Sequence, residues 1–199
     1  MAVKKTVHTA EEIRSVLEEL KKQTDRGAGI IAASVTEELL AVVIQERLLP
    51  LNSDLRQALF ERMNAPLSTM SAKINLGRAL GLYSDVGAKR LHMLREVRNR
   101  FAHRIEALTF DHPIVVDAMQ DGLADVPPPK FKSNRFAFEM IFAACCMLLL
   151  GQSGQNIRIN NLGETRPEIF LQLLSVLDPA MAEKISALGL EPKPDPTGK

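Results

Sequence analysis

Residues 84–103 read SDVGAKRLHMLREVRNRFAH, and this stretch decides the fold. Its apolar residues recur three or four positions apart, which is the spacing of one face of an α-helix. Ser84 or Asp85 is the expected N-cap, because both side chains accept hydrogen bonds from the first turn of a helix. We therefore expect a helix of about five turns. Its buried face should consist of Leu91, Leu94, Val97 and Phe101.

Helical patterns also account for the rest of the chain, and no alternating strand pattern competes with them. Thr9 and Glu12 have the spacing of a capping box at the start of a first helix. Gly81 is the expected C-cap of the helix that precedes residues 84–103. Further helices are expected over residues 27–48, 55–63, 68–80, 135–150, 168–177 and 180–188, and residues 114–119 add a turn or two. The sequence therefore predicts an all-α protein, a single-domain helical bundle of about seven to eight helices.

A proline-rich segment divides the chain. Residues 121–134 read DGLADVPPPKFKSN, and consecutive prolines favour an extended linker. We expect residues 1–120 to form the core of the bundle and residues 135–190 to supply C-terminal helices that pack on the same bundle. Residues 191–199 are rich in proline and are expected to form a disordered tail.

Composition limits the classes of function. The formal net charge is +1, so the chain as a whole does not attract nucleic acid or an anionic membrane. Cys145 and Cys146 are adjacent, which suits buried free thiols and offers no spacing for a zinc site. The longest uncharged apolar run, residues 140–150, is shorter than the about 20 residues that span a bilayer. The N-terminus lacks the apolar core of a signal peptide. We expect a cytoplasmic protein without cofactor, metal or membrane association.

Short blocks of sequence between residues 24 and 113 carry a family resemblance. They are residues 59–61 (LFE), 64–67 (NAPL), 71–74 (SAKI), 79–82 (ALGL), 94–103 (LREVRNRFAH) and 109–111 (TFD). Their order resembles the mannitol operon repressor family, as do DRG at residues 25–27 and EELL at residues 37–40. The resemblance implies an all-α bundle with a role in transcriptional regulation. Because that family has no recognised DNA-reading motif, it also implies action through protein partners.

The end of the same stretch resembles a second group. Arg98, Asn99 and His103 match the motif of the HEPN superfamily. Active members of that superfamily are endoribonucleases, commonly dimers that pool two such motifs. The resemblance implies that these three residues are catalytic if the chain is a metal-independent ribonuclease, for example a toxin or defence component.

Helix geometry separates two of these residues. Arg98 and His103 are five positions apart, or about 140° around a straight helix, so they do not share a face. Arg95, Asn99 and His103 follow each other at intervals of four and form one polar stripe. A composite site needs the helix to end near Phe101 or a second chain to supply the missing group. We therefore expect any nuclease activity to require a symmetric dimer, and we expect the chain to form a homodimer.

The chemistry of these side chains leaves two interpretations open. RNA cleavage without metal needs a base for the 2′-hydroxyl, a role for His103, and a cation for the phosphorane, a role for Arg98. Asn99 would orient either group. In the structural interpretation, the three residues cap the helix C-terminus, where cations offset the helix dipole, or pair with Glu37 or Glu38.

Four further residues are candidates for binding. Glu37 or Glu38 can face the basic cluster as a buried carboxylate, and Arg95 and Arg100 belong to a basic set that could bind RNA or another anion. The alternative is a solvated helix of mixed charge, because Glu96 can pair with Arg100 at i,i+4. We favour a regulator that works by protein association as a homodimer, with the RNA-cleaving enzyme as the alternative.

Overall fold

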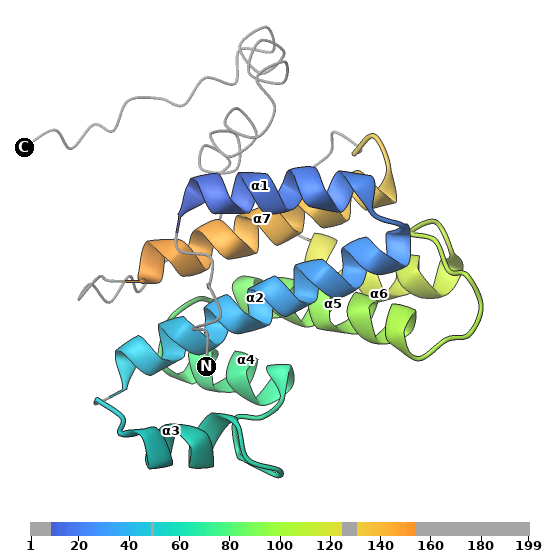
Figure 1. Ribbon diagram of the computed structural model, residues 1–199. Helices are drawn as coiled ribbons and strands as arrows, with labels where there is room; N and C mark the ends of the chain where they lie inside the picture. Colours follow the sequence, from blue (N-terminus) through green and yellow to red (C-terminus); the bar gives the residue numbers. More distant parts are fainter. Residues whose placement is uncertain (1–8, 49, 125–130, 154–199) are drawn as a thin grey trace, which may run out of the picture. The chain divides into compact units, whose positions relative to one another are not determined.

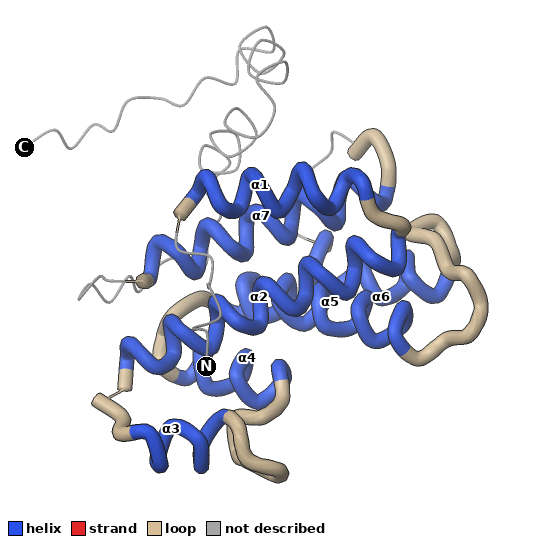
Figure 2. Tube along the Cα trace, viewed as in Figure 1, coloured by secondary structure: helices blue, strands red, loops and turns tan. Residues whose placement is uncertain are grey.

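The computed structural model describes residues 9–48, 50–124 and 131–153 (Figure 1). The chain divides into two compact units, residues 1–163 and 164–199, and the described residues all lie in the first. They form seven helices and no strand, which confirms the all-α prediction (Figure 2). The helices are α1 (Ala10–Lys22), α2 (Asp25–Arg47), α3 (Ser53–Phe60), α4 (Met70–Ala79), α5 (Asp85–Ala102), α6 (Pro113–Leu123) and α7 (Asn134–Gln152).

Local capping signals fix the helix starts. The capping box of Thr9 and Glu12 is present at α1. Ser84, not Asp85, caps α5, where its hydroxyl accepts from the backbone N–H of Gly87 over 3.4 Å. The C-cap of α4 is Leu80 and not the expected Gly81. Gly81 follows it with a φ of 71°, a left-handed conformation that favours glycine. These short-range patterns therefore mark the starts of α1 and α5 and the turn that follows α4.

The edges of the expected linker differ from the structure. Residues 121–123 continue α6, which begins at Pro113 and has 11 residues, not the turn or two expected. Asn134 already belongs to α7, because Ser133 caps that helix through the backbone N–H of Phe136. The prolines at 127–129, the helices expected after residue 153 and the expected tail lie outside the described residues.

Two helices organise the described bundle (Figure 1). Helix α2 packs against α1, α4, α5 and α7, and α5 packs against α2, α4, α6 and α7. The expected core face of α5 is confirmed, because its four apolar residues are fully buried: Leu91, Leu94, Val97 and Phe101. Helix α7, the described part of the predicted C-terminal region, also contacts α1, α5 and α6.

Length and composition would allow α2 and α7 to cross a membrane. However, 50% of the apolar window of α2 and 61% of that of α7 are buried inside the bundle. Such burial is typical of the core helices of a soluble protein. The two thiols on α7 share this environment: burial raises the pKa of Cys145 to about 12 and also raises that of Cys146.

A polar cluster joins the ends of four segments. Asp25 accepts from the guanidinium of Arg135 at 2.7 Å and from the backbone N–H of Phe110 at 2.9 Å. Arg135 also donates to Glu139 at 3.0 Å and to the backbone carbonyls of Leu20 and Gln23. The cluster thus ties the end of α1, the start of α2, the segment before α6 and the start of α7 together.

The end of α5 lies unusually close to α2. A Cβ added at Gly29 would lie 2.5 Å from Cδ2 of Phe101, so only glycine permits this approach. The Phe101 ring also meets Phe110 edge-on with centroids 5.1 Å apart, and Phe110 contacts Phe138 at 4.8 Å. This aromatic packing positions the last turn of α5, from which the candidate site residues project.

Candidate functional site

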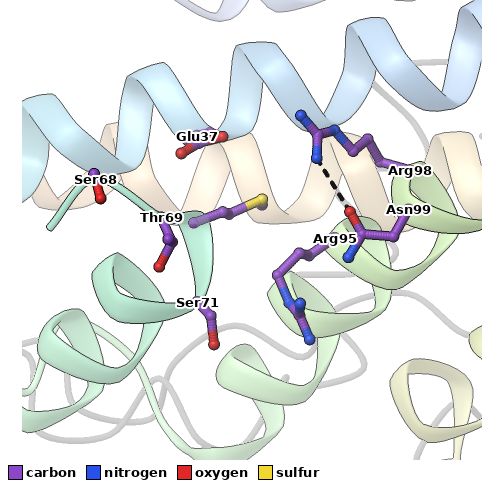
Figure 3. A pocket seen from close by; sticks show the side chains of 8 residues that line it. Glu37, Ser68, Thr69, Ser71, Arg95, Arg98 and Asn99 are labelled. Atoms are coloured by element: carbon purple, nitrogen blue, oxygen red, sulfur yellow. Dashed lines mark hydrogen bonds between the residues drawn. The ribbon is translucent and has the colours of Figure 1, made fainter. Parts of the chain in front are cut away.

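A cavity of about 250 Å³ lies between the start of α4 and the last turns of α5. Figure 3 shows its polar side chains on two facing walls. Its lining consists of Glu37, Ser68, Thr69, Met70, Ser71, Arg95, Arg98 and Asn99.

Helix α5 supplies the cationic wall. Arg95, Arg98 and Asn99 lie at i, i+3 and i+4, a spacing that gathers side chains on one side of a helix. Nη1 of Arg98 donates to Oδ1 of Asn99 over 3.1 Å (Figure 3). Arg98 therefore joins the polar stripe that the sequence had assigned to Arg95, Asn99 and His103.

His103 does not line this cavity. Helix α5 ends at Ala102, and His103 is its C-cap, with its backbone N–H donating to the carbonyl of Asn99 over 3.1 Å. The predicted stripe assumed that the helix continues through His103. The ψ of 5° at His103 lies outside the helical range, so the helix ends one residue before it and the side chain leaves the stripe. The side chain is exposed, and it makes no hydrogen bond or ion pair with the described residues.

The carboxylate of Glu37 faces the cavity, but it does not pair with the basic cluster of α5. Its partner is Lys73 of α4, at 2.6 Å. The Lys73 side chain is only 9% exposed, so this ion pair is largely buried between α2 and α4. Glu38 is half-buried and is not among the cavity-lining residues.

The two remaining candidates of α5 have different surroundings. The guanidinium of Arg95 pairs with the adjacent Glu96, so Glu96 does not pair with Arg100 as the sequence had suggested. Nε of Arg95 is buried and has no hydrogen-bond partner in the described part of the chain. Nε of Arg100 is also buried without a hydrogen-bond partner among the described residues, but Arg100 does not line the cavity.

The start of α4 supplies the second wall, which the sequence analysis did not assign to the site. Ser68, Thr69 and Ser71 bring hydroxyl groups to the cavity. Thr69 is the N-cap of α4, and its Oγ1 accepts from the backbone N–H of Ala72 over 3.2 Å. Thr69 as a capping residue could have indicated in the sequence where α4 starts. It could not have indicated that the start of α4 lies opposite Arg95.

A surface loop follows α5. Arg26 of α2 donates to the backbone carbonyls of Arg104, at 2.8 Å, and Glu106. Between them, the side chain of Ile105 is fully exposed, with a relative exposure of 102%. Because Arg26 holds both flanking carbonyls, the loop presents an apolar side chain to solvent from an anchored backbone.

His92 on α5 has a pKa that its surroundings shift toward the uncharged form. Burial, and secondarily the nearby Arg95, lower the pKa of His92 below its ordinary value. Burial therefore favours the neutral form of the His92 imidazole over the charged form. Within the described ranges, no group of three or more His, Cys, Asp or Glu side chains could hold a metal ion.

Comparisons with known proteins do not extend this description. No protein-family model, curated protein or solved structure matches the chain. The described fold and site define an all-α helical bundle with an arginine-lined cavity at the junction of α4 and α5.

Proposed function

We propose that the chain is a cytoplasmic transcriptional regulator of the mannitol operon repressor type that acts through protein association and does not read DNA. The sequence blocks between residues 24 and 113 and the net charge of +1 support the proposal. A helix that reads DNA needs several exposed cations to contact phosphates. On α5, which has the most arginines of the described helices, only Lys89 and Arg98 are exposed cations. Arg90 is buried, Arg95 pairs with Glu96, and Arg100 is partly exposed.

The observation that carries the proposal is the surface made by Arg104, Ile105 and Glu106, which we call the 104–106 surface. All three side chains are exposed, in the order cation, apolar residue, anion. In a two-fold contact with a second copy, Arg104 of each chain would meet Glu106 of the other, and the two Ile105 side chains would meet at the axis. An apolar centre with a charged rim is typical of protein interfaces. The first partner we propose is therefore a second copy of this chain.

Ile105→Asp is expected to separate the two copies. Two carboxylates would face each other at the axis, so we expect the dissociation constant to rise at least about tenfold, or roughly 1.4 kcal/mol. Light scattering over a concentration series should give twice the chain mass of 22.0 kDa for the wild type and a single-chain mass for the variant.

Met63→Asp is the matched control, because Met63 is 92% exposed and lies outside the 104–106 surface. Its mass should equal that of the wild type. A wild type that stays at single-chain mass at every concentration would contradict the proposal, as would an Ile105→Asp variant that stays paired.

A second function, an HEPN-type metal-independent ribonuclease, is favoured by a specific observation. Arg98 and Asn99 are bonded to each other at the cavity, while the His103 imidazole is exposed and unengaged by the described residues. In a pair formed through the 104–106 surface, both His103 side chains would lie beside the two-fold axis. Two chains could then pool the groups that one chain keeps apart.

If the chain is a ribonuclease, His103→Ala will remove its activity. Labelled single-stranded RNA should be cleaved by the wild type in the presence of chelator, and the variant should be at least about a hundredfold slower because it lacks the general base. Circular dichroism should show an unchanged helical fold. Arg56→Ala, which removes an exposed cation of α3, is the control and should cleave normally. An inert wild-type dimer, or cleavage that persists in His103→Ala, would exclude this function for His103.

A further inference from the structure

We propose that the cavity between α4 and α5 is a binding site for a phosphate group, either as inorganic phosphate or as the phosphate of a small monoester. This site does not depend on the function proposed above. Its evidence is the charge, the hydrogen-bond donors and the size of the cavity.

The cavity carries a net positive charge. The charged residues of the lining are Arg95, Arg98 and Glu37. Two of them have charged partners outside the lining, Glu96 for Arg95 and Lys73 for Glu37. Three cations and two anions leave a net charge of +1. Lys73 holds Glu37 and Glu96 holds Arg95. Arg98 forms no ion pair within the described residues, so its guanidinium charge is available to an anion.

The cationic wall also has donors that lack acceptors. Oδ1 of Asn99 already accepts from Arg98, so the Asn99 amide offers its NH₂ group to a ligand. A guanidinium binds phosphate in a bidentate manner, with two parallel hydrogen bonds.

The opposite wall presents donors of a different kind. The first backbone N–H groups of a helix have no acceptor within the helix, and Met70 and Ser71 occupy these positions in α4. In the described structure Thr69 satisfies only the N–H groups of Ala72, through its hydroxyl, and Lys73, through its carbonyl. The first turn of α4, with the positive end of its dipole, and Ser71 therefore lie across the cavity from the arginine side chains of α5 (Figure 3).

Size and shape select a small tetrahedral anion. The volume of about 250 Å³ is below the roughly 300–1,000 Å³ of sites that bind drug-sized ligands. A phosphate has enough oxygens to accept from both walls at once, whereas a single carboxylate has two. Glu37, the only carboxylate among the lining residues, pairs with Lys73 and not with Arg98, so the Arg98 guanidinium remains for the ligand.

Calorimetric titration of the full chain tests this site. The probes are inorganic phosphate and glycerol 2-phosphate, with glycerol and chloride as controls. We expect saturable binding of both phosphates and none of the controls. Equal affinity for the two would show recognition of the phosphate alone, and tighter binding of the monoester would show that the neighbouring groups contribute; both outcomes support the site.

Arg98→Gln is the decisive variant, because it removes the charge and keeps a side chain that can donate to Asn99. We expect phosphate to bind at least about tenfold more weakly, the usual range for loss of a charge-assisted hydrogen bond. Arg56→Gln on exposed α3 is the matched control and should bind like the wild type. Arg98 is exposed, so an unchanged melting temperature will show that the variant folds.

Two results would overturn the site: no saturable binding of either phosphate by the wild type, or equal binding by the wild type and Arg98→Gln, which would mean unspecific association. Ile105→Asp should bind phosphate with wild-type affinity, so failure of the phosphate site and failure of the 104–106 contact can be told apart.

Discussion

Replacing Arg135 by methionine is expected to lower the free energy of unfolding by up to about 3 kcal/mol, because its ion pairs are partly buried and breaking a fully buried pair costs about 3–5 kcal/mol. The variant would leave the carboxylates of Asp25 and Glu139 without their cation, and the carbonyls of Leu20 and Gln23 without a donor. The side chains of Arg135 and Asp25 are 25% and 23% exposed, so water compensates only part of this loss.

Urea denaturation followed by circular dichroism measures this effect. Arg14→Met is the matched control, since Arg14 is exposed on α1, and it should change stability by no more than about 0.5 kcal/mol. Adding Asp25→Asn and Glu139→Gln to Arg135→Met should restore part of the loss, because the stranded charges are removed. If Arg135→Met were as mild as the control, the polar cluster would not hold the segment ends together.

Phe101→Ala should destabilise the fold by about 3–5 kcal/mol, the usual cost of deleting a buried aromatic ring. The ring is fully buried and meets Gly29 of α2 and Phe110. Gly29→Ala alone should cost about 1–3 kcal/mol, because its new methyl group would have to displace the ring.

The double variant distinguishes this contact from two unrelated losses. Without the ring, the methyl group at position 29 has space, so the combined cost should be clearly less than the sum of the two single costs. A double-mutant cycle from urea denaturation measures the difference. Costs that add within about 0.5 kcal/mol would mean that Gly29 and Phe101 are not in contact. The predicted coupling makes Phe101, within the RNRFAH block, a packing residue.

Local signals explain why most of the fold was predictable. Thr9, Ser84 and Gly81 act within one turn of their own positions, and the buried face of α5 follows from spacing within a single helix. The start of α3 shows the limit of such signals. Asn52 caps it, with Oδ1 accepting from the backbone N–H of Leu55 over 2.8 Å, so the helix begins two residues before the predicted 55–63.

The candidate site was only partly predictable, because its walls come from different helices. The basic and amide groups of α5 were found, and Arg95, Arg98 and Asn99 do meet at one cavity. Nothing in the spacing of α4 indicates that Ser68 and Ser71 lie opposite them, since this depends on how α4 packs on α5. His103 was misplaced because the sequence does not show where the helix ends.

Two residues of the DRG block have structural explanations that the sequence did not offer. Asp25 joins Arg135 of α7, and Arg26 anchors the carbonyls of the loop after α5. Asp25 and Arg135 are 110 positions apart in the chain, and Arg26 and Arg104 are 78 positions apart. Such contacts cannot be read from local periodicity, and the Arg26 contact anchors the loop that carries the 104–106 surface.

The most direct test of the central claim, association between proteins without DNA reading, is sedimentation velocity of the purified chain mixed with labelled genomic DNA fragments from its own organism. We predict that the protein sediments at the mass of two chains and that the DNA sediments as it does alone. A protein of single-chain mass, or a subset of fragments that sediments with the protein because of its sequence, would contradict the claim.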